Sequence, residues 1–190
     1  MPRQKPLLFV PIETKVREFH GKLLFSLAAA ERGFEVMLGG QEALVEGAAS
    51  LGRGIYVDKS ISESKTKWFQ RCRALGNSLC AWDEEGLVFF DDETYQELRF
   101  CDESFDQTDL FFAWGEVQVN AMLAKRPDIR SKVVIAGNPR FDLLRPEFRA
   151  FHASAAERRR KEFGRILLLN TNFAFANHFK GDEGLAKLLA

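Results

Sequence analysis

Short apolar runs alternate with longer amphipathic stretches over the first 140 residues or so of the chain. A buried strand reads as a short continuous apolar run, whereas a helix shows apolar residues three and four positions apart. The pattern predicts helices over 41–49, 62–75, 92–101 and 116–124, besides one that Thr14 caps and Gly33 ends. It predicts strands over 7–11, 34–38, 54–57, 78–82, 109–114 and 132–136.

Strands that alternate with helices are typical of a doubly wound α/β domain with a parallel sheet. We therefore expect a Rossmann-like domain over 1–145, with a ligand cleft at the carboxyl ends of its strands. In the first helix we expect an apolar stripe along the sheet, with the pairs Glu13–Arg17 and Glu18–Lys22 on the polar side. The stripe comprises Val16, Phe19, Leu23, Leu24, Leu27 and Ala30.

The pattern changes after Arg140. Residues 141–161 are mixed and charged, with a basic run at 158–161 that we interpret as a solvated helix face, contact with anionic lipid being the minority alternative. A new apolar run at 165–170 predicts a strand, and a helix is predicted to start at Gly184. We expect 146–190 to be a linker and the truncated start of a second, donor-binding Rossmann-like domain, so that the chain is a fragment.

The composition argues against some classes of protein. Lys plus Arg (27) equals Asp plus Glu (27), so the chain lacks the net basic charge of most nucleic-acid binders, and we expect no nucleic-acid partner. Three cysteines without C-x-x-C spacing favour reduced thiols in a cytoplasmic protein. No apolar run approaches the ~20 residues of a membrane helix. We expect a cytoplasmic protein that is at most peripheral at an inner membrane.

Two common cofactor motifs are missing from the first strand–helix turn. Residues 11–14 contain no glycine, although a dinucleotide fingerprint and a P-loop both need glycines there. The three histidines are scattered and predict no metal site. We therefore expect no cofactor and no metal.

The sequence Trp82-Asp83-Glu84-Glu85-Gly86 follows one apolar run and precedes another at 87–90. The simpler interpretation is a solvated loop that turns at Gly86. The alternative is a general base at the end of a strand, taking a proton from an acceptor hydroxyl. Glu84 and Glu85 are the candidates for this role, and Asp83 is expected to form local hydrogen bonds.

Other polar residues are expected at the same edge of the sheet. Glu13, Lys15 and Arg17 form either an ordinary helix surface or a contact for a polyhydroxylated or anionic acceptor. Residues 58–60 are equally ambiguous. Trp114 is a core residue or a platform for a sugar ring, with Glu116 beside it. Residues 137–142, which include Asn138 and Arg140, form either a turn or a hinge that lines a cleft between two domains.

Several of these stretches together resemble the bacterial surface carbohydrate biosynthesis protein family, whose members are GT-B-like and related to glycosyltransferases of capsule and lipopolysaccharide assembly. The resemblance runs from the first strand to about Asn177, and the motifs keep their order. They are Pro11-Ile12-Glu13-x-Lys15-x-Arg17-Glu18-Phe19, Arg53-Gly54-Ile55-Tyr56, Asp83-Glu84-Glu85-Gly86, Trp114-Gly115-Glu116 and the run from Gly137 to Leu144.

The resemblance implies two Rossmann-like domains, the first binding a glycan acceptor and the second a nucleotide-sugar donor. The acidic-acidic-Gly pattern is also similar to the base motif of bacterial sialyltransferases and Kdo transferases, and it falls on Glu84, Glu85 and Gly86. The His-Pro motif that binds the cytidine phosphate in those enzymes is absent, since Asn138-Pro139 resembles it only superficially. The donor site is therefore expected beyond Ala190.

The function expected from this resemblance is glycosyl transfer in surface polysaccharide biosynthesis, with a CMP-activated sugar such as CMP-Kdo as a candidate donor. We expect this chain to be the acceptor-side half and to be inactive alone. A glycerophosphotransferase or a nucleotide-sugar 2-epimerase on the same scaffold is an alternative. A non-catalytic glycan-binding or assembly module is another.

Overall fold

The structure is a computed structural model that describes residues 5–169. The chain divides into two compact units, Met1–Arg149 and Ala150–Ala190. The division lies close to the predicted domain boundary at 145, but the donor-binding character of the second unit stays a prediction. Among the described residues, no helix is both long and apolar enough to cross a membrane.

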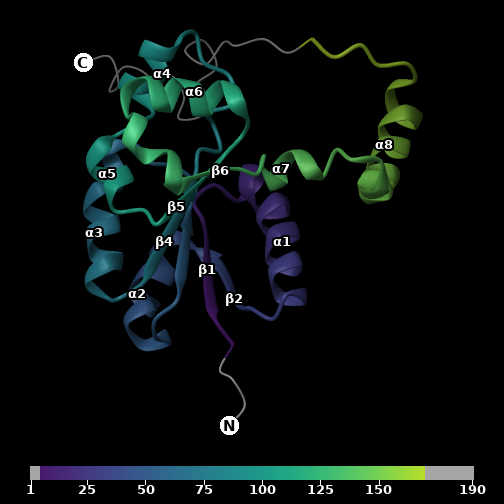
Figure 1. Ribbon diagram of the computed structural model, residues 1–190. Helices are drawn as coiled ribbons and strands as arrows, with labels where there is room; N and C mark the ends of the chain where they lie inside the picture. Colours follow the sequence, from purple (N-terminus) through teal and green to yellow (C-terminus); the bar gives the residue numbers. More distant parts are fainter. Residues whose placement is uncertain (1–4, 170–190) are drawn as a thin grey trace, which may run out of the picture. The chain divides into compact units, whose positions relative to one another are not determined.

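The first unit is built on a single sheet of six strands that are all parallel (Figure 1). Its strand order is β2-β1-β3-β4-β5-β6, which leaves β2 and β6 at the edges. The predicted α/β class and Rossmann-like arrangement are confirmed. The strands are β1 (Leu7–Ile12), β2 (Glu35–Gly40), β3 (Ile55–Asp58), β4 (Ser78–Trp82), β5 (Leu110–Ala113) and β6 (Val133–Ile135).

Helices cover both faces of this sheet, with α1 on one side and α2, α3 and α5 on the other (Figure 1). The 3-10 turns are η1 (Glu63–Lys65), η2 (Pro127–Lys132) and η3 (Pro146–Phe148). The α-helices are α1 (Lys15–Glu31), α2 (Gln41–Leu51), α3 (Thr66–Ala74), α4 (Asp92–Leu98), α5 (Asp102–Asp106), α6 (Glu116–Lys125), α7 (Pro139–Asp142) and α8 (Arg149–Phe163).

Alternating side chains of the strands supply two hydrophobic clusters, because successive residues of a strand point to opposite faces. Phe9 and Phe111 pack in the larger cluster with residues of α2 to α6, whereas Leu8 and Trp82 pack in the smaller one with residues of α1. The continuous apolar runs in the sequence therefore reflect a sheet that is packed on two sides.

The buried side of α1 differs from the predicted apolar stripe. Val16 is 91% exposed and Leu27 is 56% exposed. The helix instead buries the row Glu18, Gly21, Lys22, Ser26 and Ala29. The prediction was wrong because the amino-terminal half of this face lies at the carboxyl ends of the strands, where buried charges find partners, and not over the apolar centre of the sheet.

Some predicted elements have different limits. Gly39 and Gly40 were expected to form a turn but are the last residues of β2, paired with Pro11 and Ile12. The helix predicted over 92–101 corresponds to α4, which ends at Leu98, and α5 is a separate helix that begins at Asp102. Residues 166–169 form no strand, contrary to the prediction for 165–170, and their side chains are exposed. The helix predicted from Gly184 lies outside the described residues.

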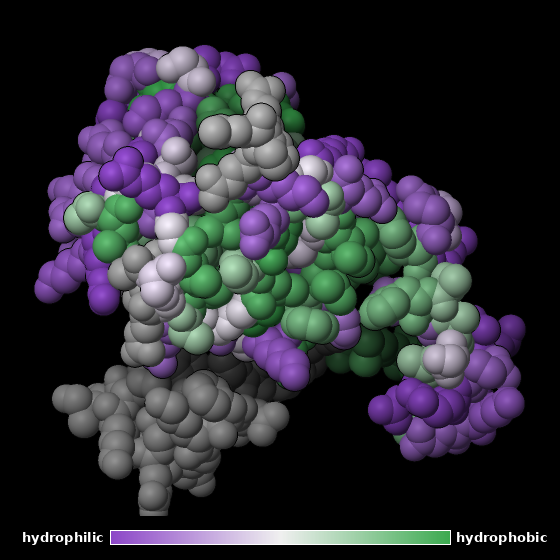
Figure 2. Space-filling view, turned by 90° about the horizontal axis from the view of Figure 1, so that it is seen from below, coloured by the Kyte–Doolittle hydropathy of each residue, from purple (hydrophilic) through white to green (hydrophobic). Residues whose placement is uncertain are grey.

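Hydrophobic side chains also gather on the face of the molecule seen from below (Figure 2). On the side of the sheet that α1 covers, the helix contacts β1 and β2. Leu110 of β5 and Val134 of β6 remain exposed, at 37% and 43%. On this side of the sheet, α1 therefore covers the strands β1 and β2 and leaves residues of β5 and β6 exposed.

Helix α7 packs closely against α1 at Gly21. A Cβ atom on Gly21 would lie 3.0 Å from the Cα of Arg140 and 3.1 Å from its backbone nitrogen. We expect Gly21→Ala to lower the free energy of unfolding by ~1–3 kcal/mol, because both contacts are with backbone that must move. Chemical denaturation measures the change. Gly40→Ala is the matched control, since its Cβ would meet nothing within 4 Å, and an equal loss in both variants would contradict the close approach.

In the second unit the described residues comprise most of α8 and the segment that follows it. Every residue of α8 is exposed. Within the basic run, Arg159 pairs with Glu162 at 2.9 Å and Lys161 with Glu157 at 3.6 Å. These pairs on one helix agree with the interpretation of 158–161 as a solvated face.

Candidate functional site

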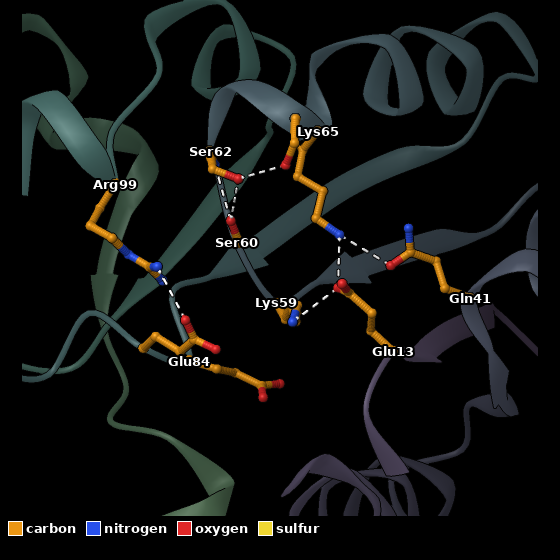
Figure 3. A pocket seen from close by; sticks show the side chains of 10 residues that line it. Glu13, Gln41, Lys59, Ser60, Ser62, Lys65, Glu84 and Arg99 are labelled. Carbon is orange, nitrogen blue, oxygen red and sulfur yellow. Dashed lines mark hydrogen bonds and ion pairs between the residues drawn. The ribbon is translucent and has the colours of Figure 1, made fainter. Parts of the chain in front are cut away.

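A polar cavity of about 360 Å³ opens at the carboxyl edge of the sheet (Figure 3). Its walls come from the segments that follow β1, β2, β3 and β4, together with Arg99 after α4. The chain order of the strands reverses between β1 and β3, and in open α/β sheets ligands bind in the crevice at such a reversal. The residues lining the cavity are Glu13, Gln41, Lys59, Ser60, Ser62, Ser64, Lys65, Glu84, Glu85 and Arg99.

Glu18 fixes the turn between β1 and α1. Its two carboxylate oxygens accept the backbone N–H groups of Glu13 and Thr14, each at 2.9 Å. Thr14 occupies the N-cap position as predicted, but its hydroxyl makes no capping hydrogen bond. The capping function therefore belongs to Glu18, which reaches back as in a capping box.

Lys22 and two carboxylates form a buried charge cluster beneath the cavity. The Lys22 ammonium lies 2.7 Å from Glu18 and 3.2 Å from Glu84, and it donates to the Pro11 carbonyl at 2.5 Å. The Lys22 and Glu18 side chains are each only 2% exposed. The predicted pairing of Glu18 with Lys22 is confirmed, but its predicted position on the polar side of the helix was wrong, because α1 turns this pair toward the strand ends.

Burial by itself would raise the pKa of Glu18. The hydrogen bond from Lys22 and those from the two backbone N–H groups outweigh it and lower the pKa to about 2. The carboxylate is therefore ionised throughout the neutral and mildly acidic range.

The two predicted base candidates, Glu84 and Glu85, differ in how far their side chains are exposed to solvent. The Glu84 side chain is 6% exposed, and its Oε1 accepts the Trp82 indole N–H at 3.0 Å besides the Lys22 contact. The Glu85 side chain is 45% exposed. Its two oxygens accept from Arg17 at 3.0 Å and from Arg99 at 3.2 Å. Of the two, Glu85 is the carboxylate that a solute can reach.

Glu13 meets two lysines at the opposite wall of the cavity. Its Oε2 lies 2.9 Å from the Lys59 ammonium and 3.4 Å from that of Lys65 (Figure 3). Lys65 also contacts the Gln41 side-chain oxygen at 3.1 Å and Asp58 at 3.3 Å. These pairs, which join residues far apart in the sequence, replace the predicted pairing of Glu13 with Arg17. That prediction was wrong because Arg17 turns to Glu85 instead.

Three serine hydroxyls follow Lys59 along the cavity wall. The Ser60 hydroxyl donates to that of Ser62 at 3.0 Å, and the Ser62 and Ser64 hydroxyls are also 3.0 Å apart. Asp58, just before them, is fully buried, and burial raises its pKa despite the ammonium of Lys65. This wall therefore offers hydroxyl and ammonium donors.

Asp83 holds the end of β4 to two neighbouring elements. Its carboxylate bonds the Arg99 guanidinium, and its backbone carbonyl accepts the Trp114 indole N–H at 2.5 Å. Burial raises the pKa of Asp83, against the effect of Arg99. The expectation of local hydrogen bonding is confirmed for Asp83, whose carboxylate also accepts the backbone N–H of Glu85 at 3.3 Å.

Gly86 is required by close packing. A Cβ atom there would lie 2.3 Å from Asp83 Oδ2 and 2.6 Å from the side-chain nitrogen of Gln118. Its backbone N–H donates to the Asp83 carbonyl at 3.1 Å, which closes the turn after the acidic residues.

The other predicted site residues lie around the cavity and do not line it. Trp114 contacts Phe141 edge to face, with ring centroids 5.0 Å apart. Arg140 donates to the Glu84 carbonyl at 3.4 Å, and Asn138 is buried and accepts the backbone N–H of Arg140. Lys15 and Glu116 are exposed on the first turns of α1 and α6. Their predicted acceptor contacts stay predictions.

Sequence reasoning missed Gln41, Ser62, Ser64, Lys65 and Arg99 as cavity residues. Lys65 and Arg99 belong to a 3-10 turn and a helix end without any motif, and only the packing of those elements brings them to the cavity. The helical period of 92–98 gave no reason to expect that Arg99 would bind two acidic residues of the loop after β4.

Among the described residues, no group of three or more His, Cys, Asp or Glu side chains is arranged to hold a metal ion. The cavity walls carry ammonium, guanidinium, hydroxyl and carboxylate groups, which suit a polar or charged organic ligand. We compared the chain with models of protein families, with curated proteins and with solved structures, and none of the three comparisons gave a match. The resemblance to surface carbohydrate biosynthesis proteins therefore stays a prediction.

Proposed function

We propose that this chain is the acceptor-side half of a GT-B glycosyltransferase of bacterial surface polysaccharide biosynthesis. The observation that carries the proposal is the half-exposed carboxylate of Glu85 in a polar cavity at the strand-order reversal of a Rossmann-like sheet. Sugar hydroxyls are donors and acceptors at once, and a wall of serines, lysines, Gln41 and carboxylates complements them.

In this proposal Glu85 takes the proton of the acceptor hydroxyl as that oxygen attacks the anomeric carbon of the donor. The bond from that carbon to the phosphate oxygen breaks, and the nucleotide leaves with the bonding electron pair. Glu84 is a positioning residue, because its carboxylate is bound by Lys22 and Trp82. Arg17 and Arg99 orient Glu85 in the absence of acceptor. An activated sugar, with CMP-Kdo as the candidate, binds to a second Rossmann-like half, and the reaction takes place in the cytoplasm.

A glycan-binding function without catalysis is the second candidate. The observation that favours it is the pair of guanidinium groups on Glu85, which hold its carboxylate in two salt bridges where it can accept hydrogen bonds from a sugar. Both candidates place a glycan in the same cavity, and they differ only in turnover.

A transfer assay separates the two. The complete gene product is incubated with CMP-, CDP- and UDP-activated sugars and oligosaccharide acceptors, and products are identified by mass spectrometry. Glycosyl transfer is the expected result. Acceptor binding by this chain in calorimetry, combined with no transfer and no donor hydrolysis by the complete gene product, would leave the binding function and remove the enzymatic one.

A further inference from the structure

The strongest unexplained feature of the cavity is the convergence of Lys59 and Lys65 on one oxygen of Glu13. Both ammonium groups are nearly enclosed, with side chains 15% and 8% exposed, whereas Glu13 is 49% exposed. Lys59 also lies 3.5 Å from Glu18 and Lys65 lies 3.3 Å from Asp58, and both of these carboxylates are buried. Glu13 is therefore the accessible anion of the group and the replaceable one, because withdrawing it into water costs less than withdrawing either ammonium.

The backbone around Glu13 stays in place when its side chain moves. The N–H groups of Glu13 and Thr14 are both held by the Glu18 carboxylate, and Glu18 is held in turn by Lys22. Rotation about the side-chain bonds of Glu13 therefore removes its carboxylate from the lysines without disturbing the start of α1. The pKa of Glu13 shows that the two lysines favour an anion at this position. Burial would raise this pKa, but the hydrogen bonds and charges of Lys59 and Lys65 lower it overall.

We propose that Lys59 and Lys65 bind an oxyanion of the ligand, a phosphate or a carboxylate, and that Glu13 occupies this site in its absence. The inference rests on the proposed function in taking that oxyanion to belong to the glycan acceptor. The Ser62 hydroxyl and the Gln41 amide lie on the same wall, where they supply neutral hydrogen-bond donors to the remaining oxygens.

Such an arrangement makes Glu13 an internal competitor. A ligand binds only to the fraction of molecules in which the lysines are free of Glu13, so its apparent dissociation constant is raised by the inverse of that fraction. Glu13→Gln removes the competing charge and keeps the size of the side chain. If Glu13 occupies the lysines about nine-tenths of the time, its removal strengthens oxyanion binding about tenfold.

The test is calorimetry on the 190-residue chain with four probes: inorganic phosphate, glucose 6-phosphate, glucuronate and methyl glucoside. We expect Glu13→Gln to bind one or both anionic sugars about tenfold more tightly than the unmodified chain, with methyl glucoside unaffected. We expect Lys59→Gln to weaken the binding of the same anion by about tenfold to a hundredfold, since a hydrogen bond to a charged group is lost. Preference for glucose 6-phosphate or for glucuronate identifies the oxyanion as phosphate or carboxylate.

Glu42→Gln and Lys67→Gln, at exposed positions of α2 and α3, are the matched controls. Equal anion affinities in Glu13→Gln and Glu42→Gln overturn the proposal, and this comparison suffices if Lys59→Gln does not fold. No sugar donor is present in the titration. A positive result with no glycosyl transfer by the complete gene product would therefore reject the enzyme and keep the oxyanion site.

Discussion

Lys22→Met is expected to lower the free energy of unfolding at neutral pH by ~3–5 kcal/mol, the usual cost of breaking a buried ion pair by removing one partner. The side chain of Lys22 is 2% exposed and lies between two carboxylates, so its loss leaves buried negative charge without its ammonium. Methionine is similar to lysine in length and shape, so the decrease in the free energy of unfolding measures the effect of removing the charge. Urea unfolding followed by circular dichroism measures it.

The pH dependence of this variant distinguishes lost charge from lost packing. In the unmodified chain the pKa of Glu18 is lowered from 4.5 to about 2, so its contribution is complete above pH 4.5 and disappears as the pH falls toward 2. This contribution is about 3 kcal/mol by linkage. In Lys22→Met the hydrogen bond and charge of Lys22 no longer oppose the effect of burial on the pKa of Glu18. This carboxylate then binds a proton more readily in the folded state than in the unfolded one, so acidification from neutral pH reduces the deficit of the variant.

Lys67→Met, at an exposed position of α3, is the control and should change stability by no more than ~0.5 kcal/mol. A deficit in Lys22→Met that is the same at pH 7 and pH 5 would show that the cluster stabilises the fold through packing alone. This outcome would also weaken the argument that Lys22 keeps Glu18 in place at the start of α1.

The strands were predictable because both faces of a parallel sheet covered by helices are buried, so that consecutive residues of each strand are apolar. The run 78–82 coincides with β4, and 7–11 differs from β1 by one residue. Gly33, with φ at +91°, ends α1 as predicted, since glycine adopts the left-handed conformation without strain. These are local requirements, which a single sequence records.

The face of α1 was not predictable from its own pattern. Glu18 and Lys22, four residues apart, have the spacing of an exposed helix pair, and Val16 fits an apolar stripe. The pair is buried because the end of β4 places Glu84 opposite Lys22, and the Pro11 carbonyl accepts from the same ammonium. Both partners come from other elements, so the spacing within the helix could not reveal them.

The location of the site followed from the sequence, whereas its composition did not. Strand ends carrying Glu13 and the acidic cluster meet at one edge of the sheet, as expected of parallel strands. Glu84 and Glu85 have the same chemistry and adjacent positions, but in the structure Glu84 is turned to Lys22 and Glu85 is accessible to solvent. Of the two lysines on the opposite wall, Lys65 belongs to η1, a short turn that has no sequence signature of its own.

Glu85→Gln is expected to reduce turnover of the complete gene product by ~10²–10⁴-fold, the usual contribution of a general base. The amide keeps the shape of the side chain and one oxygen for Arg17 or Arg99, but it cannot take the acceptor proton. The loss should therefore fall on kcat, with KM for the acceptor changed only a few-fold. Initial rates measured over a range of acceptor concentrations separate the two constants.

Two further variants show whether the effect belongs to this carboxylate. Glu63→Gln removes an exposed carboxylate on the neighbouring turn η1 and should leave kcat unchanged. Glu84→Gln should lower stability before it lowers kcat, because its carboxylate is bound to Lys22 and the Trp82 indole and does not face solvent. Unchanged kcat in Glu85→Gln would remove the base assignment. A loss of kcat in Glu84→Gln at full stability as large as that expected for Glu85→Gln, with unchanged kcat in Glu85→Gln, would transfer that role to the inner carboxylate and require the Lys22 contact to open during turnover.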